Sequence, residues 1–250
     1  MEHISEAITN LPLAVQEHIR NQGSTQASVD LPALRLEIVK TRRNELENCM
    51  GIPPRYRGKD LSTLNGFERE KIQALGAVSL DGSVFLSGSP GVGKTHFAVG
   101  LAWEWLKAKM WIDIRQDGYP VVYGFNYRTG DPECVPIFRS ASDLYDELKS
   151  TFSGTTASTT NGVMGDYTKA VCLILDDVGA EQITDWKRSI LYTLIDRRYR
   201  SMRQTIITSN LSLDEIAQKI DDRIASRLVE MGPVFSLTGE DYRITIARSA

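Results

Sequence analysis

Residues 83–96 read SVFLSGSPGVGKTH, and this stretch decides the fold. An apolar run at 83–87 predicts a short strand, and the residues at 94–109 predict a helix. The loop between them fits the pattern G-x-x-x-x-G-K-[ST], in the strand–loop–helix context that lets backbone N–H groups surround phosphates. The residues expected to contact a bound nucleotide are Gly88, Ser89, Pro90, Gly91, Val92, Gly93, Lys94, Thr95 and His96.

Two residues of this loop have separate predicted tasks. The ammonium group of Lys94 would bridge the β- and γ-phosphates, and the hydroxyl of Thr95 would bind Mg²⁺. The predicted cofactors are therefore ATP and Mg²⁺. For His96, which follows the loop, a packing role on the helix surface is the competing interpretation. A chance match in a turn is the alternative for the whole motif, and the flanking strand and helix argue against it.

A second apolar strand, expected at 171–175, ends in two carboxylates. Adjacent acids at the end of a buried strand are unfavourable unless a cation or hydrogen bonds compensate them. Asp176 is therefore the predicted Mg²⁺ ligand, and Asp177 would orient and polarise the attacking water. Glu181 is a weaker candidate for positioning that water. In the alternative interpretation the two acids only cap the loop after the strand.

Polar and basic residues farther along the chain supply the remaining candidates. A strand at 205–208 leads to Asn210, which would point toward the γ-phosphate if this strand lies between the other two. Arg223 and Arg227 are four residues apart and so share one helix face. Arg227 is the favoured arginine finger, which one subunit supplies to the phosphate bound in its neighbour, and Arg223 is the lesser candidate. Pairing with acids of the same helix is the alternative for both.

Alternating strands and helices from about residue 65 predict an α/β fold with a parallel sheet. Segment 110–134 predicts a β-hairpin, and the Ser/Thr/Gly-rich segment 153–165 predicts a mobile surface loop. The other predicted elements are strands at 136–139, 234–237 and 242–246, and helices at 141–151, 186–200, 213–219 and 221–230.

The first 50 residues have a different pattern. They predict a helix at 31–50, stopped by the prolines at 53 and 54, and a less regular helix at 4–20. We therefore expect an N-terminal helical, partner-binding segment at 1–50 and one ATP-binding domain at 51–250.

Composition excludes several classes of protein. The chain has 250 residues, 42% of them hydrophobic and 24% charged, as in ordinary soluble domains. It has neither a run of about 20 apolar residues nor the charge order of a signal peptide, so no membrane partner and a cytoplasmic location are expected. Its three cysteines, Cys49, Cys134 and Cys172, form no CxxC pair and suggest neither disulfides nor zinc. The net charge of −3 argues against coating of nucleic acid by bulk electrostatics.

The ordered motifs resemble those of the DnaC-type replicative helicase loaders and of the related IstB-type transposition ATPases. The resemblance runs from about residue 50 to the end of the sequence. The segments that carry it are IPPRYRGKDLSTL, SGSPGVGKTH, LILDDVGAE, IDRRYRSMRQTIITSNLS and DDRIASRL. It implies a RecA-like AAA+ core with a five-stranded parallel sheet of order 5-1-4-3-2, flanked by helices and lacking a C-terminal lid.

The resemblance also implies a function. It predicts an ATPase that self-associates when ATP is bound, binds single-stranded DNA and delivers a replicative helicase gripped by segment 1–50. Asp177 stands where many such ATPases carry Glu, which implies slow or partner-stimulated hydrolysis. Tyr56, Arg57 and Leu61 match the region that borders the adenine, and Arg243 matches a recurrent arginine near the end of the family's sequences.

Two regions are candidates for contact with DNA. The helix at 141–151 and the loop after it occupy the place of the family's DNA-facing insertion. Arg197, Arg198, Arg200 and Arg203 form a basic cluster that could meet DNA phosphates. A solvated helix face is an equal alternative for this cluster.

Three other functions stay open at this point. An IstB-type transposition helper would assemble on duplex DNA and recruit a transposase. A small-molecule kinase could use the same phosphate loop, but it needs an arginine-bearing lid and an acceptor pocket, and neither is evident in the sequence. An ATP-gated interaction module would bind ATP without useful turnover.

Overall fold

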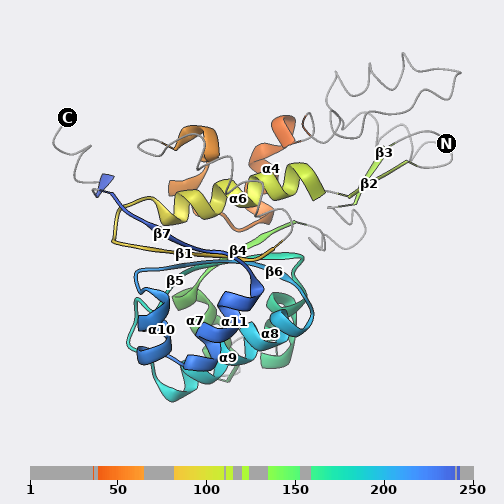
Figure 1. Ribbon diagram of the computed structural model, residues 1–250. Coiled ribbons are helices and arrows are strands. Elements are labelled where there is room, and N and C mark those ends of the chain that lie inside the picture. Colours follow the sequence, from red (N-terminus) through yellow and green to blue (C-terminus); the bar gives the residue numbers. More distant parts are fainter. Residues whose placement is uncertain are drawn as a thin grey trace, which may run out of the picture.

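The computed structural model describes residues 36, 39–64, 82–109, 111–114, 120–123, 135–152, 159–239, 241 and 242. The described residues build three layers, with a parallel sheet between two layers of helices (Figure 1). The predicted α/β fold is therefore confirmed.

Five parallel strands form the central sheet, in the order β4-β5-β6-β1-β7. Numbered along the chain as core strands 1 to 5, this order is the predicted 5-1-4-3-2. The carboxyl ends of β1, β5 and β6 consequently lie side by side at one edge of the sheet. The strands are β1 (Val84–Gly88), β4 (Ile137–Ser140), β5 (Cys172–Val178), β6 (Gln204–Ser209) and β7 (Val234–Leu237).

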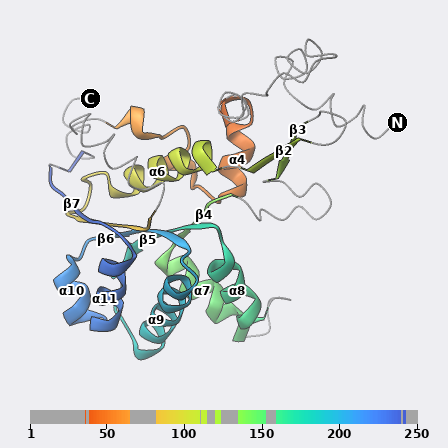
Figure 2. The ribbon, with the colours of Figure 1, turned by 45° about the vertical axis from the view of Figure 1, so that its right-hand side comes forward.

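The helices divide unequally between the two faces of the sheet, as Figure 2 also shows. One face carries α6 (Lys94–Lys109) and α4 (Arg43–Cys49), with the short helices η1 (Pro54–Tyr56) and η2 (Leu61–Thr63) beside them. The other face carries α7 (Ala141–Phe152), α8 (Thr160–Lys169), α9 (Asp185–Arg200), α10 (Leu213–Lys219) and α11 (Asp222–Met231).

Two hydrophobic cores follow from the period of two in the buried strands. In β5, Ile174 packs on the side of α6, whereas Leu173 and Leu175 pack on the side of α9. In β6, Ile206 packs on the side of α6 and Ile207 packs on the side of α9. Both faces of the strands are covered, which accounts for their continuous apolar sequence.

The prediction of a loop at 153–165 is wrong for the second half of that segment, because α8 begins at Thr160. The hydroxyl of Thr159 accepts a hydrogen bond from the amide of Gly162 at 3.1 Å and caps the helix. Val163, Met164 and Tyr167 are buried against the second core. Packing of this face overrides the weak helix propensity of the Ser/Thr/Gly-rich sequence.

The hairpin predicted within 110–134 is present in its described part. β2 (Trp111–Ile114) pairs antiparallel with β3 (Pro120–Tyr123), with Trp111 opposite Tyr123. The helix predicted at 4–20 lies outside the described residues, and so does the strand predicted at 242–246 apart from Tyr242. Of the helix predicted at 31–50, the structure gives α4 and a few residues before it.

No helix among the described residues combines the length and apolarity that a membrane crossing requires. Cys49 and Cys172 carry free thiols, and burial raises the pKa of the Cys172 thiol to about 12.

Candidate nucleotide-binding site

The glycine-rich loop joins the end of β1 to the start of α6, as its motif requires. Gly91 and Gly93 have φ angles of 78° and 99°, which side-chain-bearing residues rarely adopt. Helix α6 begins at Lys94, so its N-terminus and the positive end of its dipole face the loop. Phosphate binding is therefore what the local backbone can support.

Lys94 links the loop to the end of β6. Its Nζ donates to the carbonyls of Gly88 and Ser89 at 2.8 and 2.9 Å, and to Oδ1 of Asn210 at 2.6 Å. The side chain is buried although it carries a charge, and these acceptors compensate for its lost hydration. The structure thus brings together two of the predicted catalytic residues, which are far apart in the sequence.

Asp176 lies where the predicted metal site requires a carboxylate. Its Oδ2 accepts from the hydroxyl of Thr95 at 3.1 Å, and its Oδ1 accepts from the hydroxyl of Thr208 at 2.6 Å. Burial raises the pKa of Asp176 above the ordinary value for aspartate, against the opposing effect of these hydrogen bonds. A desolvated carboxylate beside a hydroxyl is the hard-oxygen ligand set that Mg²⁺ prefers, so these residues fit the ion.

Asp177 is turned out of the sheet at the same edge. The pairing of β5 with β6 shifts register between Leu175 and Val178, and Asp177 has a φ of 60° within this irregularity. Its Oδ1 accepts from Nδ2 of Asn210 at 2.9 Å, and its amide donates to the hydroxyl of Thr208 at 2.9 Å. The backbone strain therefore holds an exposed carboxylate beside Asn210.

Thr208 is a site residue that the sequence reasoning missed. Its hydroxyl donates to the carboxylate of Asp176 and accepts from the backbone amide of Asp177, so it links the two adjacent acidic residues. The only signal in the sequence was its place in the polar end of the strand before Asn210, which is common at strand ends.

His96 lies beside η2. Its Nε2 is 2.9 Å from the hydroxyl of Thr63 and 3.1 Å from the carbonyl of Asp60. Burial lowers its pKa. These contacts support the packing interpretation of His96, as an anchor of the preceding segment on α6.

Three further predicted candidates have structural partners of their own. Glu181, the weaker candidate for positioning water, forms an ion pair with Lys187 of α9. The ring of Tyr56 packs against that of Phe138, with centroids 6.5 Å apart. Leu61 packs against Gly100 in α6.

The segment after β7 returns to the phosphate loop. The amide of Tyr242 donates to the carbonyl of Gly91 at 3.2 Å. A methyl group at Gly91 would come within 1.8 Å of Oδ1 of Asp241, so that carboxylate lies directly against the loop. Sequence reasoning did not find this contact, because nothing local links the two segments.

The predicted arginine fingers lie on the helical layer made by α9 and α11. Arg227 donates to Oδ1 of Asp196 from Nε at 2.9 Å and from Nη2 at 2.6 Å. Arg223 donates to the carboxylate of Asp221 from Nε at 2.9 Å and from Nη2 at 2.7 Å. No hydrogen bond within the described part of the chain joins either arginine to the phosphate loop, which is compatible with a role toward a neighbouring copy.

The prediction that Arg198 belongs to a basic cluster in contact with DNA is wrong. This side chain is fully buried, and burial lowers its pKa to about 10. It donates to the hydroxyl of Thr205 at 2.9 Å and to the carbonyls of Tyr167 and Ala170 at 2.6 and 2.9 Å. Arg198 therefore joins α8, α9 and β6 in the interior, where DNA cannot reach it.

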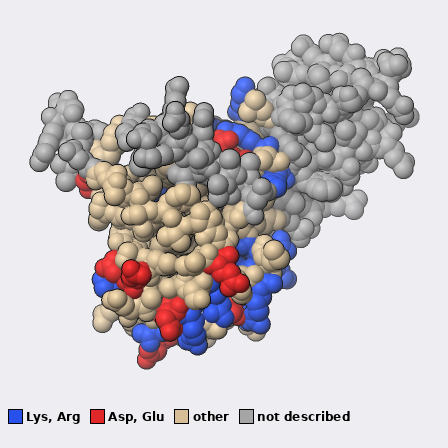
Figure 3. Space-filling model, in the orientation of Figure 1, with Lys and Arg blue, Asp and Glu red and all other residues tan. Residues whose placement is uncertain are grey.

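The exposed members of that cluster are Arg197 and Arg200. Arg200 forms an ion pair with Asp196. Figure 3 shows one face of the layer formed by α7 to α11, at the bottom of the view. On this face basic and acidic side chains are interspersed and form no single basic patch. This mixture weakens the case for phosphate contact through α9.

Comparison with known proteins finds a matching family model, similar sequences and similar structures. Residues 134–250 match the family model of the IstB-like ATP binding protein. The replicative helicase loader DnaC of Buchnera aphidicola subsp. Acyrthosiphon pisum (strain APS) is 25% identical over 146 residues, which cover 58% of this chain and 50% of the relative. DnaC of Escherichia coli (strain K12) is 19% identical over 252 residues, which cover 91% of this chain and 90% of the relative.

Solved structures agree with this assignment of the fold. A crystal structure of the DnaC helicase loader superposes with a TM-score of 0.56 at 24% identity, covering 74% of this chain and all of that one. The resemblance to DnaC-type and IstB-type proteins and the RecA-like AAA+ fold are therefore confirmed. The chain spans about half the length of the first curated relatives that it matches.

Proposed function

We propose that this chain is an ATP-hydrolysing replication protein that binds single-stranded DNA and loads a replicative helicase. The observation that carries the proposal is the convergence of Lys94, Thr95, Asp176, Asp177 and Asn210 at one edge of the sheet. The similarity to DnaC-type loaders supports the biological role.

We propose a step in hydrolysis for each of these side chains, and their geometry supports it. Lys94 would exchange its contacts with loop carbonyls for oxygens of the β- and γ-phosphates. Thr95 and Asp176 would hold Mg²⁺, which supplies charge neutralisation on those phosphates when bound. Asp177 and Asn210, already hydrogen-bonded to each other, would hold the attacking water in line with the γ-phosphate.

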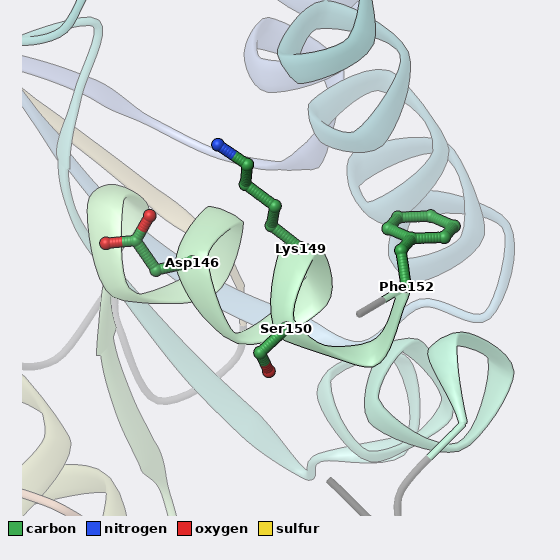
Figure 4. A pocket seen from close by; sticks show the side chains of 4 residues that line it. All are labelled: Asp146, Lys149, Ser150 and Phe152. Carbon is green, nitrogen blue, oxygen red and sulfur yellow. The ribbon is translucent and has the colours of Figure 1, made fainter. Parts of the chain in front are cut away.

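A surface at the end of α7 supports contact with single-stranded DNA. A hollow of about 540 Å³ is lined by Asp146, Lys149, Ser150 and Phe152. Figure 4 shows Lys149 and Phe152 projecting on one side of α7 and Ser150 on the other. Phe152 is 65% exposed and has Trp186 edge-on at 6.3 Å. An exposed aromatic ring beside a lysine is the combination on which unpaired bases stack.

The remaining parts of the proposal concern partners and place. Segment 1–50 would grip the helicase, the protein would act in the cytoplasm, and ATP would drive its self-association. The arginines of the α9–α11 layer would then face the phosphates of the next copy.

Helicase loading can be tested by copurification with the replicative helicase, with and without Mg²⁺–ATP. We expect Lys94→Ala to retain the helicase but to lose its deposition on single-stranded DNA. Absence of ATP binding by the wild type, or deposition unaffected by Lys94→Ala, would overturn the proposal.

A transposition role is the second candidate, and the match to the IstB-like family model favours it. Such a protein would polymerise on duplex DNA in the presence of ATP. Binding to labelled single and double strands of the same sequence separates the two roles. Preference for duplex, together with no retention of helicase, would select the transposition role.

A further inference from the structure

The ring of Tyr192, on α9, contacts both predicted finger arginines. The guanidinium carbon of Arg223 is 4.4 Å from the ring centroid, and that of Arg227 is 4.9 Å from it. The phenol oxygen also accepts from Nη2 of Arg227 at 3.1 Å. One aromatic side chain therefore fixes both cations in relation to each other.

Asp196, one helical turn after Tyr192, binds Arg227. Its Oδ1 accepts from Nε and Nη2 of Arg227, and these hydrogen bonds are partly buried. The carboxylate also pairs with Arg200. These arginines lower the pKa of Asp196, against the opposing effect of its burial.

The exposed donors of the two arginines identify the face available to a ligand. An arginine has five N–H donors, and Asp196 occupies the Nε/Nη2 edge of Arg227. Its Nη1 donates to the carbonyl of Arg223 in an exposed hydrogen bond of 3.2 Å. Arg223 binds Asp221 through Nε and Nη2 and is 60% exposed, so its Nη1 end stays accessible.

A hollow of about 320 Å³ adjoins this end of the layer. Asp185, Arg188, Ser189, Tyr192, Asp221 and Arg223 line it. Nε of Arg188 is buried, with no hydrogen-bond partner within the described residues. An acceptor-rich group entering from outside would therefore meet several cationic donors.

We propose that Tyr192 and Asp196 are positioning residues, which hold Arg223 and Arg227 ready for the γ-phosphate of ATP bound to a second copy of the chain. This inference rests on the proposed ATPase function. The ring keeps the two guanidinium groups together, and the carboxylate fixes the edge of Arg227 that points away from the phosphate. The arrangement limits the conformational entropy that the cations lose when the copies associate.

The competing explanation is that the cluster only ties α9 to α11 within one chain. Complementation between copies separates the two explanations. A Lys94→Ala copy cannot use ATP but has an intact arginine face, whereas a Tyr192→Leu copy has an intact phosphate loop and a loosened arginine face. Only a role across the interface lets one defect compensate for the other.

We expect Tyr192→Leu alone to lower kcat at least about tenfold while its affinity for ATP changes less than twofold. Tyr192→Phe keeps the ring and should retain most of the activity. In an equal mixture with random assembly, one interface in four pairs a Tyr192→Leu nucleotide site with a Lys94→Ala arginine face, so about a quarter of wild-type turnover should return.

The matched control replaces Lys94→Ala in the mixture with the double variant Lys94→Ala/Arg227→Ala, which should restore nothing. Asp196→Asn repeats the test through a different contact, in case Tyr192→Leu fails to fold. Active wild type without complementation by either variant overturns the inference alone. Wild type that never hydrolyses ATP overturns the proposed function as well.

Discussion

Oδ1 of Asn210 lies 2.6 Å from the ammonium nitrogen of Lys94. The other end of the same amide donates to Asp177. The amide can satisfy both partners in only one orientation, with its oxygen toward the lysine and its nitrogen toward the carboxylate. Asn210 therefore links the group that binds phosphate to the group that would hold the attacking water.

Replacement of Asn210 by alanine should affect turnover rather than binding. Asn210→Ala removes the donor that orients Asp177, whereas Lys94 keeps two carbonyl acceptors in the loop. We expect kcat to fall about tenfold to a hundredfold, with an ATP dissociation constant within about threefold of wild type. Steady-state phosphate release and direct ATP titration measure the two quantities. A large loss of affinity with unchanged kcat would contradict this role.

Asp176→Asn should separate stability from metal binding. The buried carboxylate has a raised pKa because burial disfavours its charge, so a neutral amide of the same shape should leave the melting temperature unchanged or higher without ligand. For the wild type, ATP at 100 times its Kd should raise the free energy of unfolding by about 2.7 kcal/mol. Chelation of Mg²⁺ should remove most of that increase. The variant should show little difference between Mg²⁺–ATP and ATP with chelator. An equal response in both proteins would exclude Asp176 as the metal ligand.

Arg198 and its neighbour Arg197 provide a matched pair. Arg198→Ala leaves several buried carbonyl groups without a donor and opens space between α8 and β6. We expect a loss of about 3 kcal/mol or more in the free energy of unfolding, measured with urea. Arg197 is exposed, and Arg197→Ala should change this free energy by less than about 0.5 kcal/mol. Similar losses of unfolding free energy in both variants would contradict the buried position of Arg198.

Gly100 tests the docking of the segment around η2 on α6. A Cβ at this position would lie 2.5 Å from Cδ2 of Leu61 and 2.9 Å from its backbone nitrogen. Alanine gains about 0.5–1 kcal/mol over glycine inside a helix, but overpacking costs about 1–3 kcal/mol, so Gly100→Ala should destabilise the protein. A Cβ added at Gly165 in α8 would meet nothing within 4 Å, and Gly165→Ala should be neutral or stabilising. Denaturant titration of both variants gives the comparison, and a stabilising Gly100→Ala would contradict the contact.

The order of motifs was enough to predict the sheet and the central site. A phosphate loop, an acidic strand end and a polar strand end occur in that sequence, and parallel strands bring their carboxyl ends to one edge. Asp176, Thr95, Lys94 and Asn210 consequently lie within reach of one another.

Features that depend on packing across the chain could not be predicted in this way. The run Arg197-Arg198 shows two adjacent basic residues, and only the fold reveals that the second points inward to carbonyls of α8. Helix α8 is stabilised by its buried face in spite of its composition. Thr208 and Asp241 take part in the site through contacts with residues distant in the sequence, for which a single sequence carries no local signal.

The hydrogen bond between Tyr242 and Gly91 joins the phosphate loop to the segment that follows the edge strand β7. A loop that reshapes around a triphosphate must carry this amide with it or break the hydrogen bond. Asp241 and Tyr242, which lie against the loop, are therefore expected to shift when the loop takes up or releases a nucleotide.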